Sequence, residues 1–245
     1  MRLFGRGFFV ACHTEDPDRG VTSYLDMAKM PNKLIFIRVI NMTIEKDFHR
    51  LQHSNQRLLT IRTYLSHVGN TSWNTVSVLK DGNSGKVLAT SRRKTVIINK
   101  VTRKPQPLPN WWKRKYAPTV VDSQELVVPS LEVPSENTYR YILTVTRKDT
   151  DLNKHVSNAS YVKFCFDAAT EAIRNNFYVG FHGDILSYGV EALRMSFVKE
   201  ARAGDSLTVI TWQDTHNPKI LHFSFEKADE IIYQNSMGFF LRSYL

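Results

Sequence analysis

The feature that most constrains how this chain can fold is one long amphipathic segment, near residues 158–174, in a sequence dominated by strand-like patterns. Apolar residues recur there in two adjacent stripes, which are Tyr161, Cys165, Ala168 and Ala172, then Val162, Phe166, Ala169 and Ile173. Steps of three and four residues place such stripes on one face of a helix. Ser157 or Asn158 suits the N-cap. The pattern therefore predicts a half-buried helix of roughly 17 residues.

Three polar residues that can take part in chemistry stand immediately before this helix. Asp151, Asn153 and His155 recur at every second position. The aligned peptide dipoles make the start of a helix positive, and its N–H groups can bind an anion. Polar side chains gathered at this end suit a site that polarises a carbonyl group.

Strand-like segments surround the helix in two similar sets, each a strand and a helix followed by four strands. The first set comprises Leu3–Val10, a short helix ended by Pro31, and strands at Leu34–Lys46, Arg57–Val68, Ser72–Leu79 and Lys86–Asn99, with a hairpin turn at Asp81–Gly85. The second comprises Tyr139–Lys148, the long helix, Gly189–Glu200, Ser206–Trp212, Ile220–Glu226 and Glu230–Phe240. The order predicts two copies of one α+β unit.

The two copies are unequal. Asp16-Pro17-Asp18 before Tyr24 echoes Asp149-Thr150-Asp151 before Tyr161, but the first copy lacks counterparts of Asn153 and His155. We therefore assign residues 1–102 to a scaffolding half and residues 139–245 to the half that carries the site. Residues 103–138 hold six of the nine prolines and read as a basic linker that wraps around the molecule rather than packing as an element.

The formal net charge of +10 is concentrated in one stretch, because residues 86–115 hold ten Lys or Arg and no acid. Such a run attracts an anionic partner, such as nucleic acid, an anionic membrane, a phosphorylated cofactor or an acidic carrier protein. A solvated face with no partner is the simpler interpretation. No run approaches the ~18 consecutive apolar residues of a membrane-spanning helix, which excludes that class.

Cysteine usage indicates a reducing compartment. Cys12 and Cys165 lie far apart, and Cys165 sits on the apolar helix stripe, so we expect two reduced thiols and no disulfide. The expected location is cytoplasmic. The first residues, MRLFGRGFFVACH, are also faintly similar to an organellar presequence, although a first strand is the interpretation we favour.

Several motifs resemble those of the acyl-acyl-carrier-protein (acyl-ACP) thioesterases and their 4-hydroxybenzoyl-CoA thioesterase-like relatives. Residues 151–161 are similar to the family's D-x-N-x-H-V-N-N-x-x-Y motif, with Ser157 in place of the first Asn of the pair. Met195–Glu200 is similar to a later strand that ends in an acidic residue, and Val96–Arg103 to the segment that closes the first half. The resemblance covers most of the chain and is strongest over residues 139–205.

This resemblance implies an α+β double hot-dog fold, in which each of two tandem repeats is a helix wrapped by a curved antiparallel sheet. It implies hydrolysis of fatty acyl thioesters of ACP or CoA, with no cofactor and no metal ion. The implied catalytic residues are Asp151, Asn153, His155 and Glu200. Glu200 is the expected water-orienting base, Asn153 and His155 would hold the thioester or water, and Asp151 would orient His155 or the water. Ala201 stands where many members have Cys, which excludes a cysteine nucleophile there.

Simpler interpretations stay open beside this one. Glu200 could pair with Lys199 or Arg202, and Asp151 could cap the helix. A non-catalytic acyl-CoA or acyl-carrier binding protein is the alternative function, whereas nucleic-acid binding is not expected because no known module accompanies the basic run. We expect an apolar acyl tunnel lined partly by Ile35, Ile37, Val39 and Ile61, and either a monomer, which a double hot dog makes a pseudo-dimer, or a homodimer.

Overall fold

The computed structural model describes residues 24–30, 33–50, 58–151 and 153–240. The predicted strand Leu3–Val10 and the Asp16–Asp18 echo of the site motif lie outside these ranges. All strands predicted between Leu34 and Phe240 are present, and the hairpin turn at Asp81–Gly85 joins two of them as expected. Asp81 closes that turn by accepting hydrogen bonds from the backbone N–H groups of Asn83 and Ser84.

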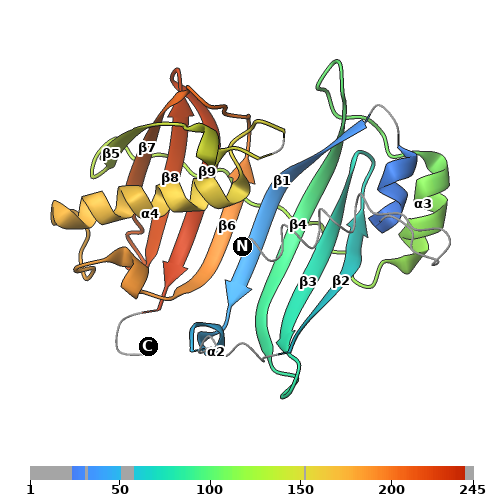
Figure 1. Cartoon of the computed structure of the whole chain (residues 1–245), viewed down its shortest axis with the longest axis horizontal. Helices are drawn as coiled ribbons and strands as arrows, with labels where there is room; N and C mark the ends of the chain where they lie inside the picture. The colour runs from blue at the N-terminus through green and yellow to red at the C-terminus, as the bar shows by residue number, and fades with distance from the viewer. Residues whose placement is uncertain (1–23, 31–32, 51–57, 152, 241–245) are drawn as a thin grey trace.

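The strands of the described residues form one nine-stranded antiparallel sheet in the order β2-β3-β4-β1-β6-β9-β8-β7-β5 (Figure 1). Their bounds are β1 Lys33–Ile44, β2 Leu59–Val68, β3 Ser72–Asp81, β4 Val87–Asn99, β5 Tyr139–Thr144, β6 Val190–Phe197, β7 Ser206–Gln213, β8 Ile220–Lys227 and β9 Glu230–Phe239. The two sets of strands meet where β1 pairs with β6, residues 39–43 against 192–196. Strands from both halves therefore make one continuous sheet.

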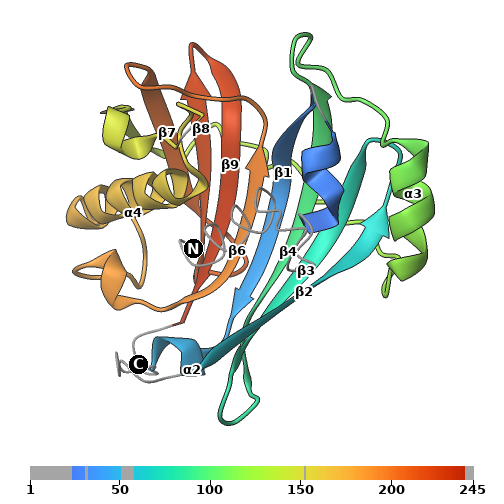
Figure 2. The ribbon, with the colours of Figure 1, turned by 45° about the vertical axis from the view of Figure 1, so that its right-hand side comes forward.

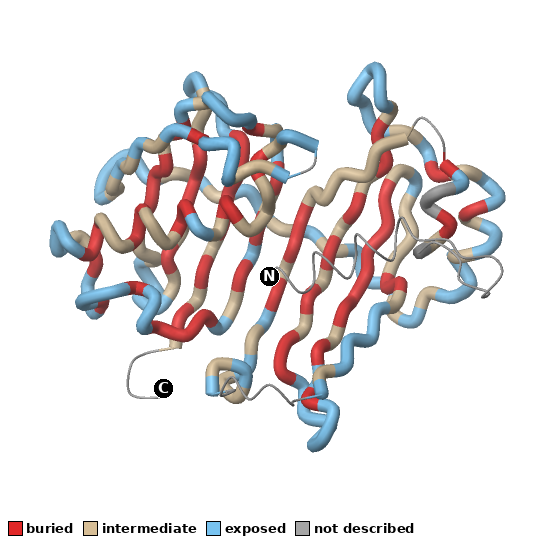
Figure 3. Tube along the Cα trace, in the orientation of Figure 1, coloured by how far each residue is buried: buried red, intermediate tan, exposed pale blue. Residues whose placement is uncertain are grey.

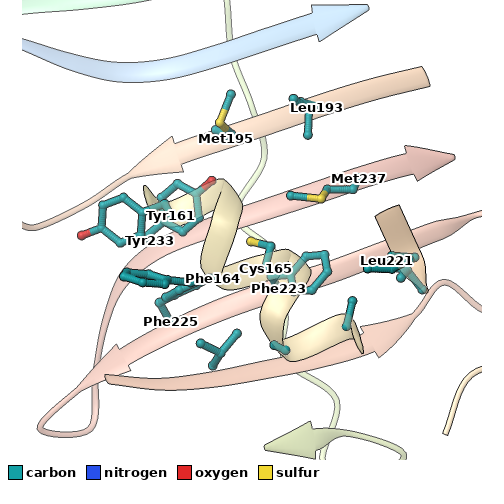
Figure 4. Close-up of a cluster of buried hydrophobic side chains, with 14 of the residues drawn as sticks. Tyr161, Phe164, Cys165, Leu193, Met195, Leu221, Phe223, Phe225, Tyr233 and Met237 are labelled. Atoms are coloured by element: carbon teal, nitrogen blue, oxygen red, sulfur yellow. The ribbon is translucent and has the colours of Figure 1, made fainter. Parts of the chain in front are cut away.

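The predicted long helix is α4, Asn158–Arg174, and it lies across one face of the sheet over β6 to β9 (Figures 1 and 2). Its buried side includes the whole first predicted stripe and, from the second, Ala169 and Ile173. The side chains of Tyr161 and Cys165 point toward the strands (Figure 4). Tyr161 stacks on Tyr233 of β9, with ring centroids 4.3 Å apart. The pattern omitted Phe164, which is also buried. Most of the buried residues of this half gather between α4 and the sheet (Figure 3).

The linker contains a helix that the sequence reading did not expect. Residues Asn110–Tyr116 form α3, which packs at the β2 edge of the sheet with Trp112 completely buried. The Trp112 ring lies against that of Trp73, and its Nε1–H donates to the carbonyl of Leu25, 2.8 Å away. The prediction that this stretch does not pack as an element was therefore wrong, because one apolar ring can anchor two helical turns.

The first half has no regular helix in its described residues comparable to α4. Tyr24–Lys29 forms a kinked 3-10 stretch, η2, in which Leu25 and Asp26 have φ of 56° and 51°. The predicted short helix is therefore irregular over these six residues. The carboxylate of Asp26 binds Lys29, Lys115 and Tyr116, which fastens η2 to α3.

After α3, the linker follows a defined path along the sheet. We call residues 120–131 the strap. Its contacts follow the order of the strands in the sheet. Val121 is hydrogen-bonded to Leu65 of β2. Two ion pairs, Asp122 with Arg92 and Glu125 with Lys94, join the strap to β4, and hydrogen bonds between Leu131 and Gln234 join it to β9. The strap thus links strands of both halves, and the predicted wrapping holds for this part of the linker.

Short helical turns complete the chain, namely α2 Lys46–His49, η3 Ala117–Thr119, η4 Arg147–Asp149 and η5 Ile185–Ser187. Two predicted strands are shorter than expected. β5 ends at Thr144, since Thr146 and Asp149 form a capping box that starts η4. β6 ends at Phe197 rather than Glu200, because the N–H groups of Val198 and Lys199 both donate to the carbonyl of Ile232, which breaks the ladder.

Candidate active site

The loop before α4 is held in one conformation by its own hydrogen bonds. The Oδ1 atom of Asp151 accepts from the backbone N–H groups of Asn153 at 2.8 Å and His155 at 3.3 Å. The N–H of Asp151 donates to the carbonyl of His155, and Lys154 has a φ of 63° at the turn between them. Asp151 is therefore the residue that shapes the loop. It does not cap the helix, because the N-cap is Ser157, whose hydroxyl accepts from the N–H of Ser160.

A second set of backbone contacts fixes the loop against the segment that follows β6. His155 and Arg202 form an antiparallel bridge, and the N–H of Val156 donates to the carbonyl of Ala201. Tyr161 is buried, and burial raises the pKa of its phenol. These contacts bring Glu200 beside His155 although 45 residues separate them in sequence.

The side chains of His155 and Glu200 are in direct contact. His155 Nε2 lies 3.1 Å from Glu200 Oε2, and the two side chains are 20% and 24% exposed. A guanidinium nitrogen of Arg202 lies 3.3 Å from the same Nε2. An imidazole nitrogen donates when it carries a proton and accepts when it does not. Protonated Nε2 thus donates to Glu200, and deprotonated Nε2 accepts from Arg202.

The other oxygen of Glu200 is held from the first half of the chain. Arg103 forms an ion pair with Glu200 Oε1. Neither sequence-level alternative for Glu200 describes this arrangement, since Lys199 pairs with Glu230 and Arg202 faces His155. Reasoning from sequence missed Arg103, because only the tertiary fold brings the end of β4 to the end of β6.

These groups open onto a cavity of about 1550 Å³. Its walls include Asp151, Asn153, His155 and Glu200, together with the Asn158 and Ala159 positions of the first turn of α4. Apolar side chains from both halves line the rest, among them Ile35, Ile37, Ile97, Tyr141, Leu143, Phe164 and Phe197. The four predicted site residues thus share one cavity, although Asn153 is exposed and approaches the others only through its backbone.

The predicted lining was half right. Ile35 and Ile37 line the cavity, but Val39 and Ile61 are not among its wall residues. A register shift between Ile37 and Val39 in β1 changes the alternation of side chains there, and Ile61 is exposed on β2. Periodicity along a strand does not reveal such an irregularity.

The thiol of Cys165 does not belong to the site. It is completely buried under α4, with Nδ2 of Asn235 at 3.6 Å, and burial raises its pKa. A thiol is nucleophilic as the thiolate, so this residue is inert at neutral pH. Ala201, at the position discussed for a cysteine nucleophile, is also buried.

The basic run of residues 86–115 does not form one face. Several of its members pair with acids in different places, as Lys86 with Asp47, Arg92 with Asp122, Lys94 with Glu125 and Lys115 with Asp26. Of the run, Arg93 and Arg103 contribute to the walls of the cavity. Much of the positive charge of this run is therefore paired locally with acids, and Arg103 lies at the candidate site.

The described residues contain neither a metal-binding cluster nor a membrane-spanning helix. No three His, Cys, Asp or Glu side chains among them gather in a way that could hold a metal ion. No helix in the described part of the chain is long and apolar enough to cross a lipid bilayer.

Comparison with known proteins identifies relatives of the half that carries these residues. Residues 133–237 match the family model for the acyl-ACP thioesterase C-terminal domain. A chloroplastic acyl-[acyl-carrier-protein] hydrolase of Cuphea viscosissima is 27% identical over 114 residues, which are 44% of this chain and 28% of the relative. A chloroplastic dodecanoyl-[acyl-carrier-protein] hydrolase of Umbellularia californica is 23% identical over 57% of this chain and 37% of the relative. The matches thus span about a third of the curated relatives.

Solved structures extend the similarity to the whole fold. An acyl-ACP thioesterase from Bacteroides thetaiotaomicron superposes with a TM-score of 0.68 at 19% identity, covering 98% of this chain and 87% of that one. The 12:0-ACP thioesterase from Umbellularia californica gives 0.65 at 17% identity, covering 90% and 79%. The fold is therefore the predicted α+β double hot dog. Residues 133–237 match the C-terminal domain of the acyl-ACP thioesterases, and the whole chain is similar in fold to solved members of that family.

Proposed function

We propose that this protein hydrolyses fatty acyl thioesters to a free fatty acid and a thiol, with acyl-ACP or acyl-CoA as substrate. The observation that carries the proposal is the contact of His155 with Glu200, 3.1 Å, in the wall of a cavity lined elsewhere by apolar side chains. Such a cavity suits an acyl chain with its polar end at these residues. The match of residues 133–237 to the acyl-ACP thioesterase C-terminal domain supports the reaction class.

Glu200 is assigned as the general base. A carboxylate has about four acceptor positions on two oxygens, so its contacts with His155 and Arg103 leave room for a water molecule. Glu200 would take a proton from that water as its oxygen attacks the thioester carbon. The carbon–sulfur bond then breaks, and the thiolate leaves with a proton returned from Glu200 or solvent.

The start of α4 is assigned to the developing negative charge. Asn158 and Ala159 lie in the cavity wall, and first-turn N–H groups have no acceptor within their own helix. Donors fixed in place before the reaction stabilise an oxyanion without reorganisation. Asn153 and His155 would orient the thioester or water, and Asp151 would keep both on the loop.

One observation favours a second candidate, a non-catalytic acyl-carrier or acyl-CoA binding protein. Both oxygens of Glu200 are engaged, which is also what a purely structural ion pair would show. In that case the cavity would bind the acyl group without turnover.

The cellular compartment stays a prediction, and the cytoplasm is the one we propose for this chain.

Thiol release from acyl-CoA and acyl-ACP panels of graded chain length separates the two candidates. Wild type should release thiol, and Glu200→Gln should lower kcat by about 10² or more, the contribution usual for a positioned general base. Glu191→Gln is the matched control, since it removes an exposed carboxylate on β6 outside this cavity. Equal rates in wild type and Glu200→Gln would contradict the assigned mechanism, and binding without thiol release would favour the binding protein.

A further inference from the structure

Arg103 has an unusual backbone for its residue type. Its φ is 58°, in the left-handed region that side chains other than Gly, Asn and Asp rarely occupy. Such conformations persist where the surrounding structure imposes them, and they are concentrated at functional sites. This outlier therefore calls for a reason beyond the turn itself.

The turn that imposes this conformation is closed around Asn99, the last residue of β4. The side-chain oxygen of Asn99 accepts from the N–H groups of Val101 and Thr102, both at 2.8 Å. Its backbone N–H donates to the carbonyl of Lys104, and its carbonyl accepts from the N–H of Arg103, both at 2.9 Å. Four hydrogen bonds thus fix the point from which the Arg103 side chain starts.

The side chain reaches from that turn to Glu200. Glu200 lies in the loop after β6, outside the ladder, so the sheet does not hold its carboxylate in place. His155 contacts one carboxylate oxygen and Arg103 the other. Donors on both oxygens set the direction of the carboxylate plane, and charge-assisted bonds do so more strongly than neutral ones.

We propose that Arg103 is a positioning residue for Glu200, so that the first half of the chain supplies a part of the site in the second half. The proposal rests on the proposed function for the role of Glu200 as base. Its chemistry is the orientation of a carboxylate by a guanidinium, with no bond made or broken. On this proposal, the turn around Asn99 directs the Arg103 guanidinium toward Oε1 of Glu200.

The decisive variant is Arg103→Gly, because glycine accepts a positive φ without strain, so the variant removes the side chain and its guanidinium without straining the turn. We expect an unchanged or higher melting temperature, a KM within about twofold of wild type, and a kcat lowered about tenfold or more, as when a group that orients a catalytic residue is lost. Arg103→Lys should restore part of kcat, and added guanidinium ion should restore activity to Arg103→Gly but not raise that of wild type.

Lys104→Gly is the matched control. It removes a cation from the same turn, whereas the hydrogen bonds of Lys104 in the described part of the chain run through its backbone. Its kcat should equal that of wild type. If Arg103→Gly also retains wild-type kcat, Arg103 is only a surface ion pair and the proposal is overturned. If kcat of Arg103→Gly exceeds that of wild type, Arg103 slows the reaction, and the proposal is overturned as well.

A crystal structure of Arg103→Gly separates this proposal from the proposed function. Loss of the 3.1 Å contact between Glu200 and His155 in the variant supports positioning, even if wild type hydrolyses no thioester. Retention of that contact overturns it, even if wild type is active. Absence of hydrolysis by wild type overturns only the proposed function.

Discussion

At the scale of the residue, the site combines a local motif with partners from elsewhere in the chain. The spacing of Asp151, Asn153 and His155 suits the observed loop, because the Asp151 carboxylate accepts hydrogen bonds from the backbone N–H groups of Asn153 and His155. Sequence spacing could supply this much, since the contacts are local. The contacts of His155 with Glu200 and Arg202 depend on the bridge between two distant segments, and only the resemblance to a family pointed to Glu200.

A substitution at Asp151 tests whether its carboxylate acts chemically or by shaping the loop. Asn presents the same accepting oxygen, so Asp151→Asn should keep the loop and retain kcat within about threefold. Asp151→Ala loses both hydrogen bonds and should lower kcat by about tenfold or more. The measurement is steady-state thiol release by both variants beside wild type. A loss in Asp151→Asn as large as that in Asp151→Ala would instead assign the negative charge a direct part in the reaction.

At the scale of the element, helix prediction succeeded for α4 and failed for α3. The two apolar stripes of α4 follow helical spacing over 17 residues, and that length makes the signal distinct. The seven residues of α3 are preceded by Pro109 and rest on Trp112, so no periodicity could develop. What holds α3 in place is tertiary, namely the Trp112–Trp73 contact and the ion pairs of Asp26.

The acid dependence of stability should reveal the Asp26 cluster that joins η2 to α3. The hydrogen bonds from Lys115 and Lys29, helped by Tyr116, hold the pKa of Asp26 well below its usual range. A lowered carboxyl pKa stabilises the fold above the unfolded-state pKa of about 4, and this contribution is lost as the pH falls below that value. The melting temperature of Asp26→Asn should therefore be lower than that of wild type at pH 7, and the difference should narrow toward pH 2.

Asp229→Asn is the control for this prediction. Asp229 has a similar φ of 61° but is exposed in the turn between β8 and β9, and Asn tolerates that backbone as well as Asp does. Its melting temperature should follow that of wild type at every pH. If the difference in melting temperature between wild type and Asp26→Asn stays constant across pH, the charge of the Asp26 carboxylate is not what stabilises the fold.

At the scale of the whole molecule, the two halves share one sheet and one cavity. The repeat in the sequence predicted two units, but not that β1 and β6 would pair or that cavity walls would come from both sides. Strand periodicity says which face of a strand is buried and nothing about which strands are neighbours. Relative placement came instead from the family resemblance, which implied the double hot dog.

A shared sheet and the strap predict that both halves unfold together. Trp212→Phe leaves Trp73, Trp111 and Trp112, so fluorescence then reports on the first half and α3. Far-UV circular dichroism follows mainly α4, the longest helix of the described chain, in the second half. The two signals should give the same urea midpoint. Two separate midpoints would show that the β1–β6 junction and the strap do not couple the halves.

The pairing of β1 with β6 also has a consequence for a chain emerging from the ribosome. β1 acquires β4 as a neighbour on one side early in synthesis, while residues 192–196, which cover residues 39–43 on its other side, are translated much later. An uncovered strand edge is a template for pairing with other chains, and pairings distant in sequence form slowly. We therefore expect the nascent first half to pass through an interval in which that edge is uncovered and can pair with other chains.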